Sequence, residues 1–430
     1  MQRTLCKRAG PASSPGRSSR HKVALAGVAV LALLAFAPWA FAQDTLLDQL
    51  DQAGADSGAI ESNCAAAPPP ESLVEASLQY LPSLGQLLAW RTFAVAGGRC
   101  VLLDWPERRA LSGRQALGLQ RLLDQHQAAA AMVPAQALRS ADVAPLAART
   151  RPPAWHPPPT IVAGADRPSL PFCPRTAERT QQVPLELPER VAPLLLRVRP
   201  HRCVPGSRPA SGSGVLLAPD LALTAAHVIL TGDGRVCDRY RVIPGGRRYS
   251  EPPAAPFGLA FVSRAYLSER GGWNLAAAGA PALNDDFVAR TAHDHAWLRL
   301  DQSISLPDDT LWPRLRFVGG LRATPGLRLL RAGYAAIGPS GRIAPGAAVN
   351  TLGEIACPRE PGEAYWRFAL WMGPGASGGP IWRWPDRGQL FELLSIAVRM
   401  ETHGEHQYET LGPRFDADDY WRLLRVLQQR

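Results

Sequence analysis

Three short segments limit most strongly what this chain can fold into. They are Thr-Ala-Ala-His at 224–227, Asp-His-Ala-Trp-Leu-Arg-Leu at 294–300 and Gly-Ala-Ser-Gly-Gly-Pro at 375–380, so that their histidine, aspartate and serine lie 67 and then 83 residues apart. A serine hydroxyl attacks a carbonyl at neutral pH only if an imidazole accepts its proton, and the imidazole needs a buried carboxylate to hold its tautomer. The fold must therefore bring these segments together if they act as one site.

The segments supply a candidate for each role in acyl transfer. Ser377 is the candidate nucleophile, His227 the general base and Asp294 the carboxylate that orients the imidazole. The glycines leave the backbone bare, so the N–H groups of Gly375 and Ser377 are candidates for an oxyanion hole.

Asp294 has two rivals, because Asp285 and Asp286 lie close to it in the sequence. The strand-like run Ala296–Leu300 favours Asp294, since a carboxylate at the start of a buried strand is desolvated and yet held in place. We therefore predict that Asp294 is the orienting residue.

The three segments resemble the motifs of the chymotrypsin/trypsin-like serine peptidases, and the resemblance covers about residues 185–430. Convergent hydrolases use other chain orders of the same three residues, so the order His, Asp, Ser also favours this fold. The resemblance implies a catalytic domain of two six-stranded β-barrels with a C-terminal helix. It implies a serine endopeptidase that acts on a protein or peptide substrate through an acyl-enzyme, without a cofactor. Two alternatives stay open: an inactive protease-like binding module, and an esterase that uses the same triad.

The chain departs from the family pattern at two places. Residue 376 is Ala where family members made as zymogens have Asp, so a new N-terminus at Ile161–Gly164, which resembles an activated one, would find no carboxylate there. The resemblance also places the floor of the specificity pocket six residues before the nucleophile, at Trp371, with Met372 next to it. We therefore expect no carboxylate that would select Arg or Lys substrates.

The first 42 residues predict a signal peptide. A basic segment is followed by the apolar run Val23–Ala37, and small residues at 40 and 42 fit cleavage before Gln43. The run is short for a membrane span, although an uncleaved anchor is the alternative. We expect export to the periplasm or the medium, with no membrane contact after cleavage. Six of the 47 basic residues precede position 43, so the remainder carries 41 bases against 37 acids and predicts no nucleic-acid partner.

Cysteine usage is consistent with export. Beyond the signal peptide the chain has six cysteines, an even number that indicates disulfides, and no C-x₂₋₄-C spacing that would indicate a metal site. The pair Cys203 and Cys237 flanks His227 and resembles the family's bridge across the histidine loop. The other expected pairs are Cys64 with Cys100 and Cys173 with Cys357.

Composition divides the rest of the chain. Residues 43–150 have a helical pattern rich in Leu, Ala and Gln, and Ser112 is a candidate helix cap. We expect a mainly helical region there, either a removable propeptide or a lasting interaction domain. Residues 151–184 are a Pro-rich linker, and 185–430 show the short apolar runs of an all-β domain that ends in a helix.

Overall fold

The computed structural model describes residues 37–55, 64, 68–105, 107–131, 187, 190–203, 211–230, 237, 239–245, 257–268, 270, 291–318, 328–335, 349–354, 365–368, 370, 372–383, 391–402 and 408–429. The chain divides into two compact units, Met1–Gln49 and Leu50–Arg430. Helix α2 (Ala37–Gly54) contains the predicted signal-cleavage site, and the rest of the predicted signal peptide lies outside the described residues. Among the described residues, no helix has the length and apolar character that crossing a membrane requires.

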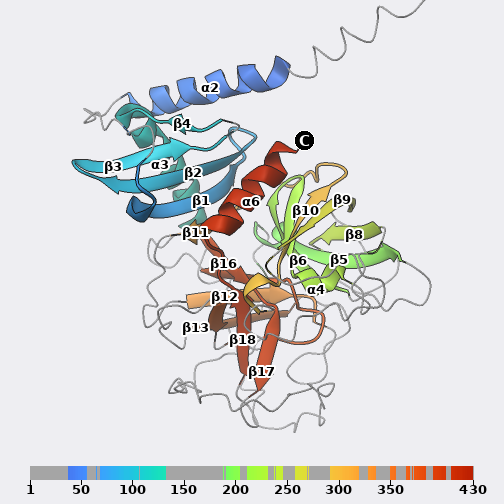
Figure 1. Ribbon diagram of the computed structural model, residues 1–430. Helices are drawn as coiled ribbons and strands as arrows, with labels where there is room; N and C mark the ends of the chain where they lie inside the picture. The colour runs from blue at the N-terminus through green and yellow to red at the C-terminus, as the bar shows by residue number, and fades with distance from the viewer. Residues whose placement is uncertain are drawn as a thin grey trace, which may run out of the picture. The chain divides into compact units, whose positions relative to one another are not determined.

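Six antiparallel strands form a closed barrel in the order β10-β7-β6-β5-β8-β9 (Figure 1). Strands β6 and β7 are buried along their whole length, as strands enclosed in a packed domain are. The short apolar runs predicted as strands lie in this barrel and in the strands that follow it. The barrel strands are β5 (Leu195–Arg202), which follows the 3₁₀ turn η5 (Ala192–Leu194), β6 (Gly212–Ala218), β7 (Leu221–Thr224), β8 (Arg239–Pro244), β9 (Ala260–Leu267) and β10 (Ala296–Leu300).

The second predicted barrel is not closed in the described part of the chain. Its strands belong to two sheets, of which one has the order β13-β12-β15-β16-β11-β1-β2-β3-β4 and the other the order β14-β18-β17. The sheets meet where the Ser395 hydroxyl of β16 donates to Pro413 O of β18 at 2.7 Å. The strands are β11 (Arg314–Val318), β12 (Arg328–Gly333), β13 (Val349–Glu354), β14 (Tyr365–Phe368), β15 (Pro380–Arg383), β16 (Glu392–Ile396), β17 (Arg399–Thr402) and β18 (Tyr408–Pro413).

The open arrangement has a physical reason in β11. This strand pairs in parallel with β16 on one side and antiparallel with β1 on the other, with Ala76 opposite Val318 and Leu78 opposite Leu315. A strand has only two edges, and both edges of β11 are thus occupied. The sheet therefore continues into the N-terminal strands and does not turn back to close.

The prediction of a mainly helical N-terminal region is wrong for residues 73–110. These residues form β1 (Leu73–Leu81), β2 (Gln86–Val95), β3 (Gly98–Leu103) and β4 (Arg109–Ala110), after the 3₁₀ turn η1 (Pro70–Ser72). Seven consecutive residues of β2 are buried, so both faces of the strand are covered and the two-residue alternation that marks an exposed sheet is lost. Leu- and Ala-rich sequence without alternation favours a helix on propensity, and tertiary packing overrides that preference here.

The predicted helix after Ser112 is confirmed as α3 (Gly113–Ala131). The Ser112 hydroxyl accepts from Gln115 N at 3.2 Å, and Ser112 N donates to Gln115 Oε1 at 3.1 Å, so the two residues form a capping box. Leu119 and Leu123 are buried, as their helical spacing predicts.

Polar contacts join the N-terminal strands to the rest of the unit. Glu75 of β1 pairs with Arg314 of β11, and Gln79 Nε2 donates to Trp312 O at 3.3 Å. At the other end of the N-terminal sheet, the buried carboxylate of Asp104 accepts from Arg91 and from the hydroxyl of Tyr420. Because buried polar groups are stable only when paired, these contacts tie residues 73–104 to both β11 and the C-terminal helix.

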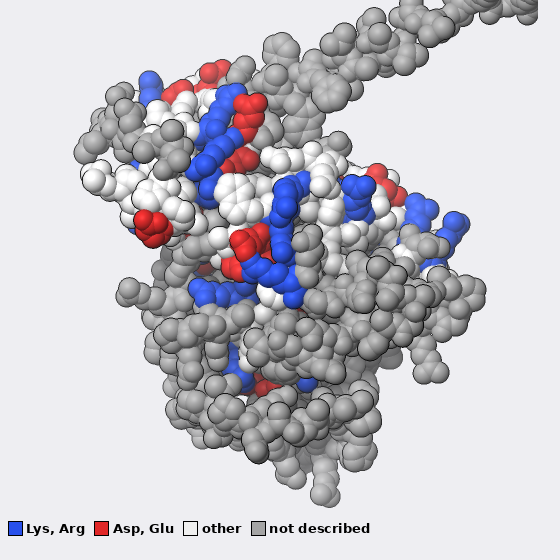
Figure 2. All heavy atoms as spheres, viewed as in Figure 1, with Lys and Arg blue, Asp and Glu red and all other residues white. Residues whose placement is uncertain are grey.

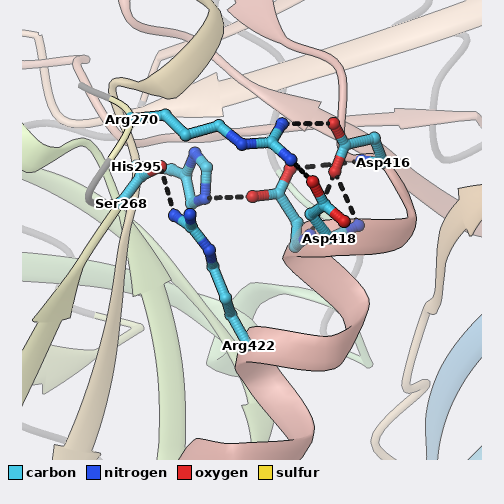
Figure 3. Close-up of polar contacts among 7 residues, drawn as sticks. Ser268, Arg270, His295, Asp416, Asp418 and Arg422 are labelled. Carbon is cyan, nitrogen blue, oxygen red and sulfur yellow. Dashed lines mark hydrogen bonds and ion pairs between the residues drawn. The ribbon is translucent and has the colours of Figure 1, made fainter.

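The predicted C-terminal helix is confirmed as α6 (Ala417–Gln428), which buries Tyr420, Leu423, Leu424 and Leu427. It begins at a capping box of Asp416 and Asp419, and its first turn is anchored to the barrel (Figure 3). Arg270 pairs with Asp416 at 2.8 Å and also with Asp418, while Arg422 Nη1 donates to Ser268 Oγ at 3.0 Å. On the face drawn in Figure 2, several of the described basic side chains lie beside acidic ones.

Candidate active site

The candidate base lies in the single helical turn α4 (Ala226–Ile229), directly after β7. The small, buried side chains of Ala225 and Ala226 let the turn pack against the barrel, while the imidazole of His227 stays 34% exposed. The candidate carboxylate comes from the neighbouring strand. Thr224 of β7 lies opposite Ala296 of β10, so the segment that leaves β7 and the segment that enters β10 run side by side.

This strand pairing brings Asp294 and His227 into contact. His227 Nδ1 lies 2.7 Å from Asp294 Oδ2, and His227 N donates to Asp294 Oδ1 at 3.0 Å. The carboxylate thus uses one oxygen for the ring and the other for the backbone of the same residue. Since a carboxylate accepts the proton on Nδ1, Nε2 is left without a proton and is the ring nitrogen that can act as a base.

Asp294 also sets the protonation of the imidazole. Burial lowers the pKa of His227, but the negative charge of Asp294 and the hydrogen bond to it outweigh this effect, so the pKa of His227 lies above its ordinary value of 6.5. The Asp294 side chain is 12% exposed, and this limited access of water keeps the interaction strong. The pair stabilises the imidazolium that forms when the ring accepts a proton.

The candidate nucleophile lies on the tight loop between residue 372 and β15. Ala376 N donates to Gly373 O at 3.0 Å and Gly379 N to Ala376 O at 2.9 Å, which folds the loop into two turns. Gly375 and Gly378 have φ values of +87° and +81°, and glycine adopts such values without a steric cost. A Cβ atom on Gly378 would overlap Ser213 O and Thr224 Oγ1, so this glycine is also required by the close approach of the barrel.

The Ser377 loop packs against the segments that hold the base. Ser213 N, in β6, donates to Ser377 O at 2.7 Å, and a Cβ built on Gly212 would lie 2.8 Å from Val228 Cγ1 and 2.9 Å from Ser377 O. Ser377 is thus near the residue that follows His227. Among the described residues no hydrogen bond joins the Ser377 hydroxyl to His227, and such bonds are often long in unliganded enzymes.

Two backbone donors of the loop are available to a ligand. Within the described part of the chain, neither Gly375 N–H nor Ser377 N–H donates to a backbone acceptor. Both residues are half-buried. An oxygen that becomes negative near the Ser377 hydroxyl would thus find the two N–H groups that the sequence predicts as an oxyanion hole.

The other predicted site residues have different outcomes. The structure pairs Cys64 with Cys100, and Cys203 with Cys237, as expected. Cys173, Cys357 and Trp371 lie outside the described residues. Met372 is buried in an apolar cluster that includes Leu370 and Ile381, so its part in a specificity pocket stays a prediction.

Sequence reasoning missed Ser213, which contacts the nucleophile loop through both backbone and side chain. The available signal was the run Gly212-Ser213-Gly214 inside an apolar strand, because glycines in a strand interior often mark a close approach of another backbone. It also missed His295, the buried neighbour of Asp294. His295 Nε2 lies 3.2 Å from Asp419 Oδ1 of α6.

No family model matches the chain, and no curated protein matches it. Among solved structures, the chain is similar to the protease Anisep from Arthrobacter nicotinovorans, with a TM-score of 0.38 and 15% identity over 55% of this chain and 97% of that one. A Glu endopeptidase has a TM-score of 0.38 and 17% identity over 59% of this chain and 97% of its own. Neuropsin, a serine protease of mouse brain, has a TM-score of 0.37 and 17% identity, over 58% and 99% of the two chains. These three structures are similar to the chain over little more than half of its length.

Proposed function

We propose that this chain is a serine endopeptidase that cleaves peptide bonds through an acyl-enzyme. In this proposal Ser377 attacks the carbonyl while His227 accepts the hydroxyl proton and then donates it to the leaving amine. Asp294 holds the imidazole, and the N–H groups of Gly375 and Ser377 bind the oxyanion. No step in this mechanism needs a cofactor.

The contact between Asp294 and His227 carries the proposal. The buried carboxylate accepts hydrogen bonds from both the ring and the backbone N–H of one histidine. Burying a carboxylate costs free energy because the charge loses its water, so packing alone does not explain why it lies there. The cost is understandable if the pair holds a base beside a nucleophile. The nearby turn with a half-buried serine and two available N–H groups supports the same function.

Labelling with a fluorophosphonate tests the proposal first, because this reagent modifies only an activated serine. We expect the reagent to label the protein and not a Ser377→Ala variant. We also expect the rate enhancement over the uncatalysed reaction to be larger for casein cleavage than for p-nitrophenyl acetate hydrolysis. Labelling with ester hydrolysis only would favour an esterase. Absence of labelling in a folded protein would favour a binding module.

We also propose that residues 68–131 are a lasting part of this protease and not a propeptide. The pairing of β1 with β11 and the shared contacts at Asp104 support this choice, since both would be lost on removal. The two disulfides indicate a protein of an oxidising compartment. Together with the N-terminal sequence, they support export to the periplasm or the medium.

A further inference from the structure

We propose that Ser213 is a positioning residue for the oxyanion site, an inference that rests on the proposed function. Ser213 lies in β6 of the closed barrel and is fully buried. Its hydroxyl donates to Gly375 O at 2.9 Å, and its backbone N–H donates to Ser377 O at 2.7 Å. One residue of the barrel thus bonds the carbonyl groups of both residues whose N–H groups form the site.

The hydroxyl of Ser213 is itself held in place. It accepts from Tyr334 N, just beyond β12, at 2.8 Å while it donates to Gly375 O. The Ser213 carbonyl accepts from Thr224 Oγ1 at 2.6 Å. Because a hydroxyl has a single proton, the Tyr334 contact leaves that proton for Gly375 O. The two hydrogen bonds therefore donate in one direction, from Tyr334 N to the Ser213 hydroxyl and from that hydroxyl to Gly375 O of the nucleophile loop.

These bonds hold the two peptide planes that flank the plane of the Ser377 N–H group. A trans peptide plane holds each C=O opposite the next N–H. Gly379 N donates to Ala376 O at 2.9 Å, which turns Ser377 N–H the other way. The Ser213 bonds fix the peptide planes on each side of this one, at Gly375 O and at Ser377 O.

Residue 376 of the loop is an alanine, so its side chain cannot hold these peptide planes by hydrogen bonds. Ala376 is fully buried, and its methyl group lies among apolar residues that include Leu329 and Ile381. A Cβ on Gly333 would lie 2.9 Å from the Ala376 Cβ, so no space remains beside it. The barrel residue Ser213 therefore supplies the polar anchor, and this anchor is already formed in the intact chain.

The flanking sequence fits the same role. A Cβ on Gly212 would lie 2.9 Å from Ser377 O, and a Cβ on Gly214 would lie 2.9 Å from Leu223 O. Larger residues on either side would push β6 away from the loop or from β7. Only with glycine at both positions can the Ser213 side chain approach Gly375 closely enough to bond it.

The test compares steady-state kinetics of the full chain with Ser213→Ala and Ser213→Cys variants on a fluorogenic peptide taken from a casein cleavage site. The Cys variant keeps the buried volume and replaces the hydroxyl with a weak donor. Because small misplacements at a reacting centre cost up to about a hundredfold, we expect kcat to fall by about tenfold to a hundredfold, with KM within about twofold. The Ki of the matching peptide aldehyde, whose adduct oxygen occupies the oxyanion site, should rise as kcat/KM falls.

The matched control is Ser395→Ala. Ser395 is also fully buried, and its hydroxyl donates to a backbone carbonyl, Pro413 O, at 2.7 Å, but it bonds no residue of the nucleophile loop. We expect it to lower the melting temperature without changing kcat or the aldehyde Ki. Equal losses of kcat in the Ser395 and Ser213 variants would show a general packing effect and overturn the inference.

The other outcomes also decide. Wild-type kcat in folded Ser213→Ala or Ser213→Cys protein overturns the positioning role while the proposed function stands. If neither variant folds, Ser213 is a structural residue and the inference is wrong. A wild-type chain that neither reacts with fluorophosphonate nor cleaves casein overturns the proposed function and this inference together.

Discussion

Asp104→Asn tests whether the N-terminal strands belong to the same cooperative unit as the candidate active site. Asp104 follows β3, and its side chain is 2% exposed. Its carboxylate accepts from Arg91 Nε at 2.5 Å and Arg91 Nη2 at 2.8 Å, and from Tyr420 Oη of α6 at 2.9 Å. A single carboxylate thus joins the N-terminal sheet to the C-terminal helix.

The magnitude follows from what the substitution leaves behind. Asparagine keeps the size of aspartate but has no charge, so the guanidinium of Arg91 stays buried without a counter-charge. Breaking a buried ion pair in this way costs about 3–5 kcal/mol. The guanidinium keeps its place over the ring of Trp421, 4.2 Å from the ring centre. We therefore expect the lower end, about 3 kcal/mol.

The matched control is Tyr420→Phe, which removes only the hydroxyl that donates to Asp104. A hydrogen bond to a charged group contributes about 1.5–3 kcal/mol, so this variant should lose less stability than Asp104→Asn. Because both changes act on one carboxylate, the double variant should lose less than the sum of the two.

Urea unfolding of the full chain, followed by tryptophan fluorescence and by circular dichroism, measures these losses. We expect the midpoint of Asp104→Asn to fall by about 1 M or more, with the two signals coincident and the slope unchanged. The reasoning is refuted if Asp104→Asn stays within about 0.5 kcal/mol of wild type. It is also refuted if the N-terminal strands unfold in a separate transition that leaves the remainder as stable as before.

Three further predictions concern the triad. Ser377→Ala should lower kcat about a millionfold with the melting temperature retained, and residual activity within tenfold of wild type would show that another residue is the nucleophile. Asp294→Asn should lower kcat about ten-thousandfold, because the amide favours the wrong tautomer of the imidazole; an active variant would direct attention to another carboxylate. The raised pKa of His227 predicts that kcat/KM rises with pH through an inflection above 6.5, as the ring loses its proton. The same raised pKa makes the folded state more stable at pH values below about 6.5, the unfolded-state pKa, and this contribution is lost as pH rises through the folded-state pKa. An inflection of kcat/KM below pH 6.5 would contradict the assignment of His227 as the base.

The contact of Asp294 with His227 could be predicted from sequence, and Ser377 proposed as the nucleophile, because each of the three residues lies beside a local signal. Asp294 immediately precedes the strand-forming run of β10, and His227 follows the buried strand β7. The tight turns around Ser377 are indicated by the neighbouring glycines, because Gly375 and Gly378 adopt positive φ values. None of these inferences needs a contact between distant parts of the chain. The contact of Asp294 with His227 then follows from one strand pairing, β7 with β10.

The N-terminal strands could not be predicted for the opposite reason. Their partner β11 begins at Arg314, more than two hundred residues after the end of β1 at Leu81. The sequence of residues 73–81 does not indicate that pairing, and burial of both faces removes the polar–apolar alternation that normally marks a strand. The open second sheet was missed with it, because the edge of β11 that β1 occupies is the edge that a closed barrel would need.

The contacts of α6 connect these strands to the candidate catalytic aspartate, and they allow a last prediction. Asp104 bonds Tyr420 of α6, and the preceding residue, Asp419, lies 3.2 Å from the buried ring of His295, next to Asp294 in the chain. Burial raises the pKa of Asp419, but the contact with His295 and the backbone hydrogen bond at Asp416 outweigh burial and hold that pKa below its ordinary value. Loss of residues 68–131 would therefore remove support from the helix that holds the neighbour of Asp294.

A full chain with a specific cleavage site inserted at residues 151–159 separates lasting docking from release. Cys64 pairs with Cys100, so after cleavage no disulfide of the described residues links the N-terminal fragment to the remainder. We expect the two fragments to elute together in size exclusion and to keep full proteolytic activity, since the β1–β11 pairing and the Asp104 contacts survive the cut. Mild urea that releases the N-terminal fragment should then abolish activity. If instead the fragment leaves in plain buffer and the remainder is fully active, residues 68–131 are a removable propeptide, and the sheet they share with β11 has no part in holding the active site.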